Sequence, residues 1–393
     1  MGVMKQAALE PKRVIHLGYG LYATDSFGGI RLITWSHQPG SDVNLKTVFR
    51  KLVQYLNDHN AVIVSERYFG RLKVASTILS LRDCTFLSLH GGAAARGRHQ
   101  VTYIEGEPIH DTMFAGFQMM VFCDPVEVGN VGQTGRLIRG RDSEYLFFSD
   151  IGRSLGSHKR FLPEEDAEAC FNSIDHELKS NGWSMHDVVR TWFYLTDILD
   201  WYDEFNHVRN TFFQKEGIFH AHPESRVPAS TGISGNGSSG WCHLDVLAMR
   251  GLGGKPLEVK RLENPLQNEA PSYGSAFSRG LAVHTTSQTN LFVSGTASID
   301  KSGQSIHINC FERQVRQTVE NIGALLEVGG ARLQDIGQST VFIKRAEDIP
   351  AFWALADEID FPLQTAVCVL ADVCRDDLLF EIDATAIMPR LNI

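Results

Sequence analysis

The clearest indication of the fold is a run whose apolar residues repeat with the period of a helix, Val315-Arg-Gln-Thr-Val-Glu-Asn-Ile-Gly-Ala-Leu-Leu326. Those residues stand at positions i, i+4, i+7 and i+11, which places them on one helical face. The pair Gly329-Gly330 then ends the helix, and the run Ser339-Thr-Val-Phe-Ile-Lys344 has the composition of a β-strand. A helix that breaks and leads into a strand is therefore the basic element of this chain.

The same order of helix, break and strand occurs twice more. Stripes with the same spacing begin at Leu45 and at Ala167, and strand-like runs follow each of them. Strands are also predicted before each helix, at 29–35, 145–150 and 290–297. Second helices are predicted only in the two later copies, at 201–213 and 349–359. Repetition over roughly a hundred residues or more indicates duplicated domains rather than a solenoid.

Three units follow from this repetition. We place the boundaries near residue 112 and in the stretch Gly251-Leu-Gly-Gly-Lys-Pro256, which gives units 1–112, 113–255 and 256–393. Because the helices segregate to one face of a mixed sheet, each unit is α+β. The pattern is weakest in the first unit, which we regard as degenerate.

The composition is that of an ordinary globular protein. A chain of 393 residues, 43% hydrophobic and 21% charged, is long enough for two or three domains with cores. No apolar run approaches the length of a membrane span, and the N-terminus lacks the apolar core of a signal peptide. We therefore expect a cytoplasmic protein without membrane contact.

Charge and metal-binding residue types exclude further classes. The seven cysteines include no Cys-x-x-Cys pair and the fifteen histidines are dispersed, which argues against disulfides and against a metal site. A formal charge of −9 disfavours nucleic acid as a partner. An anionic ligand would therefore depend on locally placed Arg and Lys.

The last strand, Leu378-Leu-Phe-Glu-Ile-Asp-Ala-Thr-Ala386, alternates with the period of two, so that Glu381 and Asp383 point to the same side. Two interpretations are open. The strand is half exposed and both carboxylates are solvated, or Glu381 is an acid/base with Cys374 at the mouth of the same pocket.

The segment Cys374-Arg-Asp-Asp-Leu-Leu-Phe-Glu-Ile-Asp383 resembles the C-terminal signature of the chorismatases. This family is built from the YjgF/RidA-like fold (endoribonuclease L-PSP-like, chorismate-mutase-like). Further similar segments are Arg190-Thr-Trp-Phe-Tyr194, Pro228-Ala-Ser-Thr-Gly-Ile233, Glu263-Asn-Pro265, Phe277-Ser-Arg279 and Val341-Phe-Ile-Lys-Arg-Ala-Glu-Asp348. The resemblance covers the chain from about Val188 onward. It implies three tandem YjgF/RidA-like units in a covalent pseudo-trimer, which we expect to be a monomer or homodimer.

The resemblance also assigns roles to residues. Glu381 is the expected catalytic acid in the cleavage of chorismate to pyruvate and a hydroxybenzoate, without metal or cofactor. Cys374 and Gly232 match the family members that form 3-hydroxybenzoate. Because chorismate is a dicarboxylate, its binding needs cations, preferably guanidinium forks. The candidate substrate-binding residues are Arg190, Thr231, Gly232, Tyr273, Arg279, Lys344, Arg345 and Cys374.

The sequence departs from the family pattern at three places. Ser275 stands where the family has a Pro after Tyr-Gly, a short insertion normally found before Phe277 is missing, and Lys344 replaces an Arg. These differences leave room for a shifted substrate.

Two other functions are compatible with the fold. In RidA-type imine deaminases a Pro-Ala-Arg begins the penultimate strand, whereas Pro228-Ala229-Ser230 and Pro362-Leu363-Gln364 here contain no arginine. A deaminase is therefore disfavoured but stays an alternative. The third possibility is a non-catalytic small-molecule-binding member of the fold, in which Glu381 only satisfies backbone donors.

Overall fold

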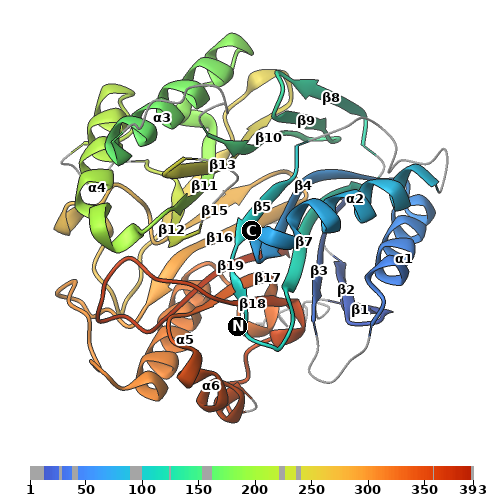
Figure 1. Cartoon of the computed structure of the whole chain (residues 1–393). Coiled ribbons are helices and arrows are strands. Elements are labelled where there is room, and N and C mark those ends of the chain that lie inside the picture. Colours follow the sequence, from blue (N-terminus) through green and yellow to red (C-terminus); the bar gives the residue numbers. More distant parts are fainter. Residues whose placement is uncertain are drawn as a thin grey trace, which may run out of the picture.

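The structure is a computed structural model that describes residues 13–25, 29–37, 43–88, 100–123, 125–152, 162–220, 226–235, 240–356 and 358–390. Within these ranges the chain forms three mixed β-sheets, each accompanied by two α-helices (Figure 1). The α+β class and the three-unit organisation predicted from the repeats are confirmed.

The first unit is more complete than its sequence suggested. Its sheet has the strand order β1-β2-β3-β7-β4-β5. Its elements are β1 (Arg13–Gly18), β2 (Leu21–Asp25), β3 (Ile30–Ser36), α1 (Leu45–Asp58), β4 (Ala61–Gly70), α2 (Leu72–Ser88), β5 (Thr102–Glu105) and β7 (Phe114–Cys123). Helix α2 was not predicted. Its inner face carries Leu72, Leu79 and Phe86, but the buried Arg82 interrupts this face, so the regular apolar stripe of the other helices does not mark it in the sequence.

The second and third units repeat this plan, with strand orders β8-β9-β10-β13-β11-β12 and β14-β15-β16-β19-β17-β18-β6. The second contains β8 (Glu127–Val131), β9 (Gly135–Arg139), β10 (Ser143–Ile151), α3 (Pro163–Ser180), β11 (Val188–Leu195), α4 (Ile198–Lys215), β12 (Ala229–Ser234) and β13 (Cys242–Gly251). The third contains β14 (Glu258–Leu262), β15 (Gly280–His284), β16 (Gln288–Ala297), α5 (Phe311–Val328), β17 (Ile336–Ile343), α6 (Ile349–Ala356), β18 (Ala366–Leu370) and β19 (Phe380–Pro389).

One irregularity recurs in all three sheets and relates their residues. The strand after the first helix pairs in parallel with the next strand, and it shifts register by one residue against its antiparallel neighbour. The extra residue is Val64 in β4, Val189 in β11 and Gly337 in β17. Positions counted from this bulge are therefore equivalent among the units.

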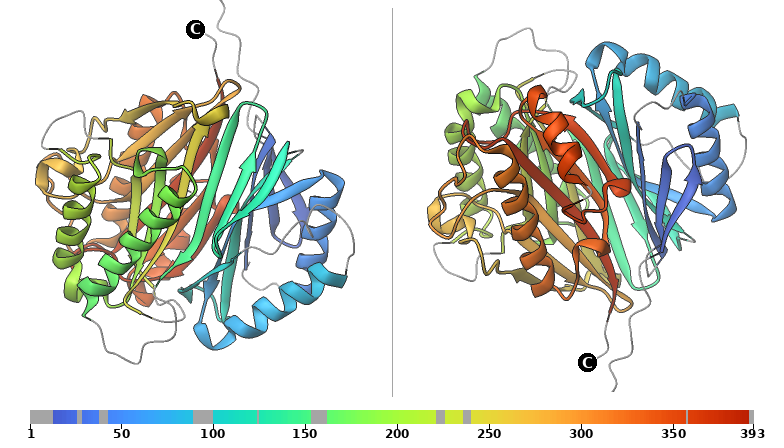
Figure 2. Two further views of the ribbon diagram at one scale, coloured as in Figure 1. Left: turned by 90° about the horizontal axis from the view of Figure 1, so that it is seen from above. Right: turned by 90° about the horizontal axis from the view of Figure 1, so that it is seen from below.

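The helices lie on the outside of the molecule and the sheets face one another (Figure 2). Each helix pair packs on one face of its own sheet and forms a separate core with it. The other faces of the three sheets meet in a common core, to which the units contribute residues such as Leu32, Phe147 and Phe342. Because side chains alternate along a strand, each sheet supplies one face to the core beneath its own helices and the other face to the common core. This arrangement is the pseudo-trimer that the family resemblance implied.

The end of the first unit lies beyond the expected position. Strand β7, Phe114–Cys123, belongs to the first sheet although it follows the boundary expected near residue 112. The short β6 (Glu107–Pro108) pairs instead with β18 of the third sheet. We therefore propose units of 13–123, 127–251 and 258–389.

Candidate active site

Strand β19 turns Glu381 and Asp383 away from the helices. Phe380, Ile382 and Ala384 pack in the core beneath α5 and α6, so the alternate positions face the second unit. Both carboxylates are buried, at 4% and 3% exposure. The interpretation of a half-exposed strand with two solvated carboxylates is therefore wrong.

Glu381 opens into a cavity of about 40 Å³ between the second and third units. The second unit lines it from α4 and β12, with Tyr202, Arg209, Ser230 and Gly232. The third unit lines it mainly from the ends of β16 and β19 and from the segments before β15 and β19, with Phe277, Arg279, Gly295, Cys374, Arg375 and Glu381. The site therefore needs both units.

The Glu381 carboxyl has the environment of a proton donor. Burial, followed by the nearby negative charge of Asp383, raises its pKa from 4.5 to about 8, although Arg279 and Arg190 act in the opposite direction. No hydrogen bond to this carboxyl comes from any other described residue. At neutral pH the group is therefore mostly protonated and available to a ligand.

Gly295 on β16 makes room for this carboxyl. A β-carbon at position 295 would lie 2.0 Å from Glu381 Oε1, far inside van der Waals contact. The strand also shifts register between Val293 and Thr296, which brings its backbone toward β19. A glycine inside an apolar strand therefore serves close approach here.

Three guanidinium groups surround the same cavity. Arg209 and Arg279 are each 1% exposed and both lie near Phe277, with their guanidinium carbons 5.6 Å and 5.4 Å from its ring centre. Arg279 Nε donates to the carbonyl of Asn268 at 3.1 Å, and Arg375 Nη1 donates to the carbonyl of Gly303 at 2.9 Å. Because Glu381 is mostly neutral, the cavity is positively charged although the chain carries a charge of −9.

Arg190 and Thr231, both predicted to bind substrate, lie behind the cavity rather than on its wall. Arg190 Nη2 donates to Thr231 Oγ1 at 2.6 Å and to Asp383 Oδ2 at 3.1 Å. Thr231 Oγ1 and Trp192 Nε1 also donate to Asp383 Oδ2, at 3.0 and 3.1 Å. Burial lowers the pKa of Arg190 to about 10, so the guanidinium keeps its charge at neutral pH. Its structural role is to hold Asp383, which in turn acts on Glu381.

The structure does not bring Lys344 and Arg345 to the cavity. Lys344 Nζ donates to the carbonyl of Asp376 at 3.0 Å and lies 3.7 Å from a carboxylate oxygen of Asp372. Arg345 forms two hydrogen bonds with Asp348, at 2.6 and 2.9 Å. Nearby acidic residues therefore pair with both cations, and neither side chain lines this cavity, so their role as substrate ligands stays a prediction.

Of the remaining predicted residues, Arg279, Cys374 and Gly232 line the cavity with Glu381. Burial raises the pKa of the Cys374 thiol to about 12, so it stays protonated and is a poor nucleophile. Tyr273 ends a short 3₁₀-helix (Ala270–Tyr273), and its side chain lies outside the described part of the structure.

Sequence reasoning missed Arg209, Arg375 and Gly295. Arg209 follows Val208 on the buried stripe of α4, where a cation without a partner is costly, and this signal could have found it. Gly295 interrupts an apolar strand, which also indicates close approach. Arg375 directly follows Cys374 in the signature segment, but its position in the sequence does not reveal that its side chain points to the cavity.

Two negative findings concern the described ranges. They contain no group of three or more His, Cys, Asp or Glu side chains arranged to hold a metal ion. No helix within them is long and apolar enough to cross a membrane.

Comparison with known proteins identifies relatives of two kinds. The sequence profile of the endoribonuclease L-PSP family matches residues 155–233 and 268–388. A 3-hydroxybenzoate synthase from Streptomyces hygroscopicus is 26% identical over 275 residues, covering 64% of this chain and 76% of that protein. A RutC family protein from Synechocystis sp. is 31% identical over 104 residues, covering 25% of this chain and 78% of that protein.

A solved structure supports the architecture. The crystal structure of a chorismatase superposes with a TM-score of 0.62 at 19% identity, covering 92% of this chain and 99% of that chain. The arrangement of three units is therefore the fold of that protein, and the resemblance to chorismatases is confirmed.

Proposed function

The chain belongs to the endoribonuclease L-PSP family, and on that premise we propose that it is an enzyme that cleaves the enol-pyruvyl ether of chorismate. The observation that carries this proposal is the buried carboxyl of Glu381, enclosed with three guanidinium groups in one cavity. The products that we propose are pyruvate and 3-hydroxybenzoate.

Glu381 would act as the general acid. Its proton passes to the terminal methylene carbon of the enol-pyruvyl group, and the remaining cation is an oxocarbenium stabilised by the ether oxygen. The Glu381 carboxylate left behind lies next to this positive charge and stabilises it. Water or the neighbouring ring hydroxyl then adds to the oxocarbenium, and the adding oxygen returns its proton to Glu381. In the water adduct the bond between the pyruvyl carbon and the former ether oxygen breaks, which gives pyruvate and a dihydroxy-cyclohexadiene carboxylate. In the ring-hydroxyl adduct the same bond breaks together with the bond from the adding oxygen to its ring carbon, so this oxygen leaves in pyruvate. The ring then passes a carbon-bound proton to the remaining oxygen and becomes 3-hydroxybenzoate.

The guanidinium groups would bind the two carboxylates of the substrate. Arg209, Arg279 and Arg375 approach the cavity from both units, and a guanidinium can hold a carboxylate by two parallel hydrogen bonds. A dianion therefore finds local positive charge in an otherwise acidic protein.

Substrate entry requires movement of the cavity wall. A volume of about 40 Å³ holds only a few water molecules, which is less than a substituted six-membered ring needs. Tyr202 and Arg375 are only partly buried, and their movement would release the ring contact of Tyr202 with Phe205 and the hydrogen bond of Arg375 to Gly303. We propose that these two residues admit the substrate.

Cys374 bears on the choice of product. Its thiol lines the cavity near Glu381 and stays protonated, so it shapes the space around the ring without attacking it. The similarity to a 3-hydroxybenzoate synthase agrees with the aromatic product.

A RidA-type deaminase is the competing function, because a RutC family protein is among the relatives. Ser230 lines the cavity at the strand position where those deaminases have an arginine. A deaminase would turn over 2-aminoacrylate and leave chorismate intact.

The test is incubation of the purified protein with chorismate at pH 7, with pyruvate measured by a coupled dehydrogenase and the ring product by chromatography. We expect pyruvate and 3-hydroxybenzoate in equal amounts. Glu381→Gln keeps the shape of the side chain without a carboxylic proton, so its rate should fall by about 10²- to 10⁴-fold. Absence of pyruvate with the wild-type protein would contradict the proposal.

A further inference from the structure

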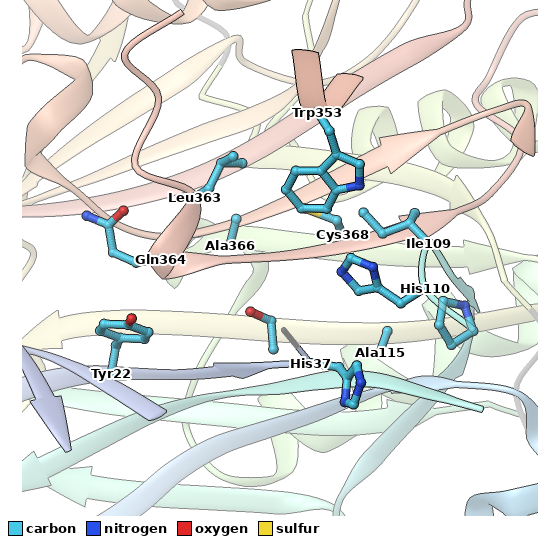
Figure 3. Close-up of a pocket in the computed structure, with 12 residues that line it drawn as sticks. Tyr22, His37, Ile109, His110, Ala115, Trp353, Leu363, Gln364, Ala366 and Cys368 are labelled. Carbon is cyan, nitrogen blue, oxygen red and sulfur yellow. The ribbon is translucent and has the colours of Figure 1, made fainter. Parts of the chain in front are cut away.

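A second cavity, of about 110 Å³, lies between the first and third units (Figure 3). Trp353 on α6 and Gln364 before β18 enter it from the third unit. Tyr22 on β2 and His37 after β3 enter it from the first, and His110 lies between the two sides. This cavity shares no lining residue with the one around Glu381.

The second cavity is the equivalent of the first in the pseudo-trimer. Tyr202 and Trp353 are each the fifth residue of their helices, α4 and α6. Ser230 pairs with Thr191, two residues after the bulge of β11, and Ala366 pairs with Ser339, two residues after the bulge of β17.

The proton donor is absent from this second cavity. Glu381 pairs with Phe342, the fifth residue after the bulge in the third unit, and Gly116 pairs with Phe69, the fifth residue after the bulge in the first. A β-carbon on Gly116 would lie 2.3 Å from the carbonyl oxygen of Trp35. Backbone contact therefore excludes any side chain at the position of the acid.

The lining of the second cavity is uncharged and aromatic. It contains no Lys, Arg, Asp or Glu. Burial lowers the pKa of His37 and of His110, so both imidazoles are neutral at pH 7. The Trp353 ring lies nearly parallel to the His110 ring, at 17° with centres 5.3 Å apart. A charged ligand would lose its hydration here without gaining an ion pair.

Polar groups are available around this apolar wall. The side-chain ends of Tyr22, His37, His110 and Gln364 form no hydrogen bond with another described residue. The volume of about 110 Å³ is smaller than that of an engineered cavity of about 150 Å³ that encloses benzene, so a substituted ring would be only partly enclosed. One aromatic ring with hydrogen-bonding substituents fits both features.

We propose that this second cavity binds a neutral, planar compound of one aromatic ring that carries hydrogen-bonding groups, and that it does so without catalysis. The ring stacks beside Trp353 and His110, and its polar groups meet Tyr22, His37 or Gln364. This inference does not depend on the proposed reaction, because it rests on different residues.

The experiment is titration calorimetry of the full chain at pH 7.5 with benzamide and, separately, with benzoate, which has the same shape and a negative charge. Because benzoate can also enter the positively charged first cavity, the comparison uses the binding that Trp353→Ala removes, which should be at least about tenfold tighter for benzamide than for benzoate. Trp353→Ala and the cavity-filling Ala366→Leu should each weaken benzamide binding by at least about tenfold. Thermal unfolding establishes whether each variant is folded. If Ala366→Leu does not fold, Trp353→Ala alone tests the site.

Glu381→Gln is the control for the other cavity and should bind benzamide as the wild-type protein does. The proposal is overturned if wild-type protein does not bind benzamide, or if Trp353→Ala binds it unchanged. Loss of benzamide binding in Glu381→Gln would likewise overturn it, because the ligand would then occupy the first cavity. Failure of chorismate turnover has no bearing on these outcomes.

Discussion

The missing side chain of Gly295 and the carboxyl of Glu381 occupy the same space, since a β-carbon on Gly295 would lie 2.0 Å from Glu381 Oε1. The carboxyl is therefore held in its buried position by close packing against a bare backbone. Its environment, rather than a hydrogen-bond partner, raises its pKa.

Gly295→Ala should displace the Glu381 carboxyl, because the end of that side chain yields more easily than two paired strands. We expect chorismate turnover to fall by about 100-fold or more, with a small change in melting temperature. Gly323→Ala is the matched control, because its β-carbon would meet Leu333 at an ordinary 3.8 Å. Equal activity of the two variants would show that the position of the carboxyl is unimportant.

Turnover should decline as the pH rises through about 8. Glu381 donates its proton only while it is protonated, and its pKa is raised to about 8 in the folded protein. The check is a profile of kcat/KM against pH from 6 to 10, with the melting temperature followed in parallel. A profile that is flat across pH 8 would contradict the assignment of Glu381 as the acid.

Stability should depend on pH through the same group. The folded-state pKa lies above the ordinary value of 4.5, so between about 4.5 and 8 the folded protein retains a proton that the unfolded chain releases. The free energy of unfolding should therefore fall as the pH rises through this window. Denaturant unfolding measures the free energy of unfolding of the wild-type protein and of Glu381→Gln. The difference between these two free energies should shrink as the pH falls toward 4.5. A difference independent of pH would argue against a raised pKa.

Arg279→Lys should weaken binding of a dicarboxylate, because an ammonium group cannot form the two parallel hydrogen bonds of a guanidinium. We expect kcat/KM to fall by about 10- to 100-fold, corresponding to about 1.5–3 kcal/mol. Arg345→Lys is the control, since Arg345 is held by Asp348 outside the cavity. If both variants lost activity equally, charge placement in the cavity would not explain the effect.

Cys374→Ala should alter the product more than the rate. The thiol lines the cavity but stays protonated, so it influences how the ring reacts after the ether is broken. Chromatography of the ring products should detect a non-aromatic dihydroxy-cyclohexadiene carboxylate at the expense of 3-hydroxybenzoate. An unchanged product ratio would show that Cys374 does not influence which ring product forms.

The fold was largely predictable because amphipathic helices repeat visibly. The stripes at 45–56, 167–178 and 315–326 lie inside α1, α3 and α5. Helix α2 was not predicted because the buried Arg82 interrupts its apolar face. The first unit extends beyond the predicted boundary near residue 112 because β7 lies between β3 and β4 in its sheet. Local sequence does not encode such a long-range pairing.

The candidate site was predictable only in part. Alternation placed Glu381 and Asp383 on one side of β19, but only the packing of two units reveals which cations face them. Arg209 comes from α4 of the second unit, whereas Lys344 follows β17 and is held by nearby carboxylates. Similarity of motifs could not separate cations that line the cavity from those that neutralise local acids.

The most direct test of the central claim is the protonation state of Glu381 itself. Infrared difference spectra between wild type and Glu381→Gln, recorded as a pH titration, follow the carboxylic acid band of this one residue. We expect the Glu381 carboxyl to be protonated at pH 7 and to ionise near pH 8. Ionisation near the ordinary value of 4.5 would contradict it.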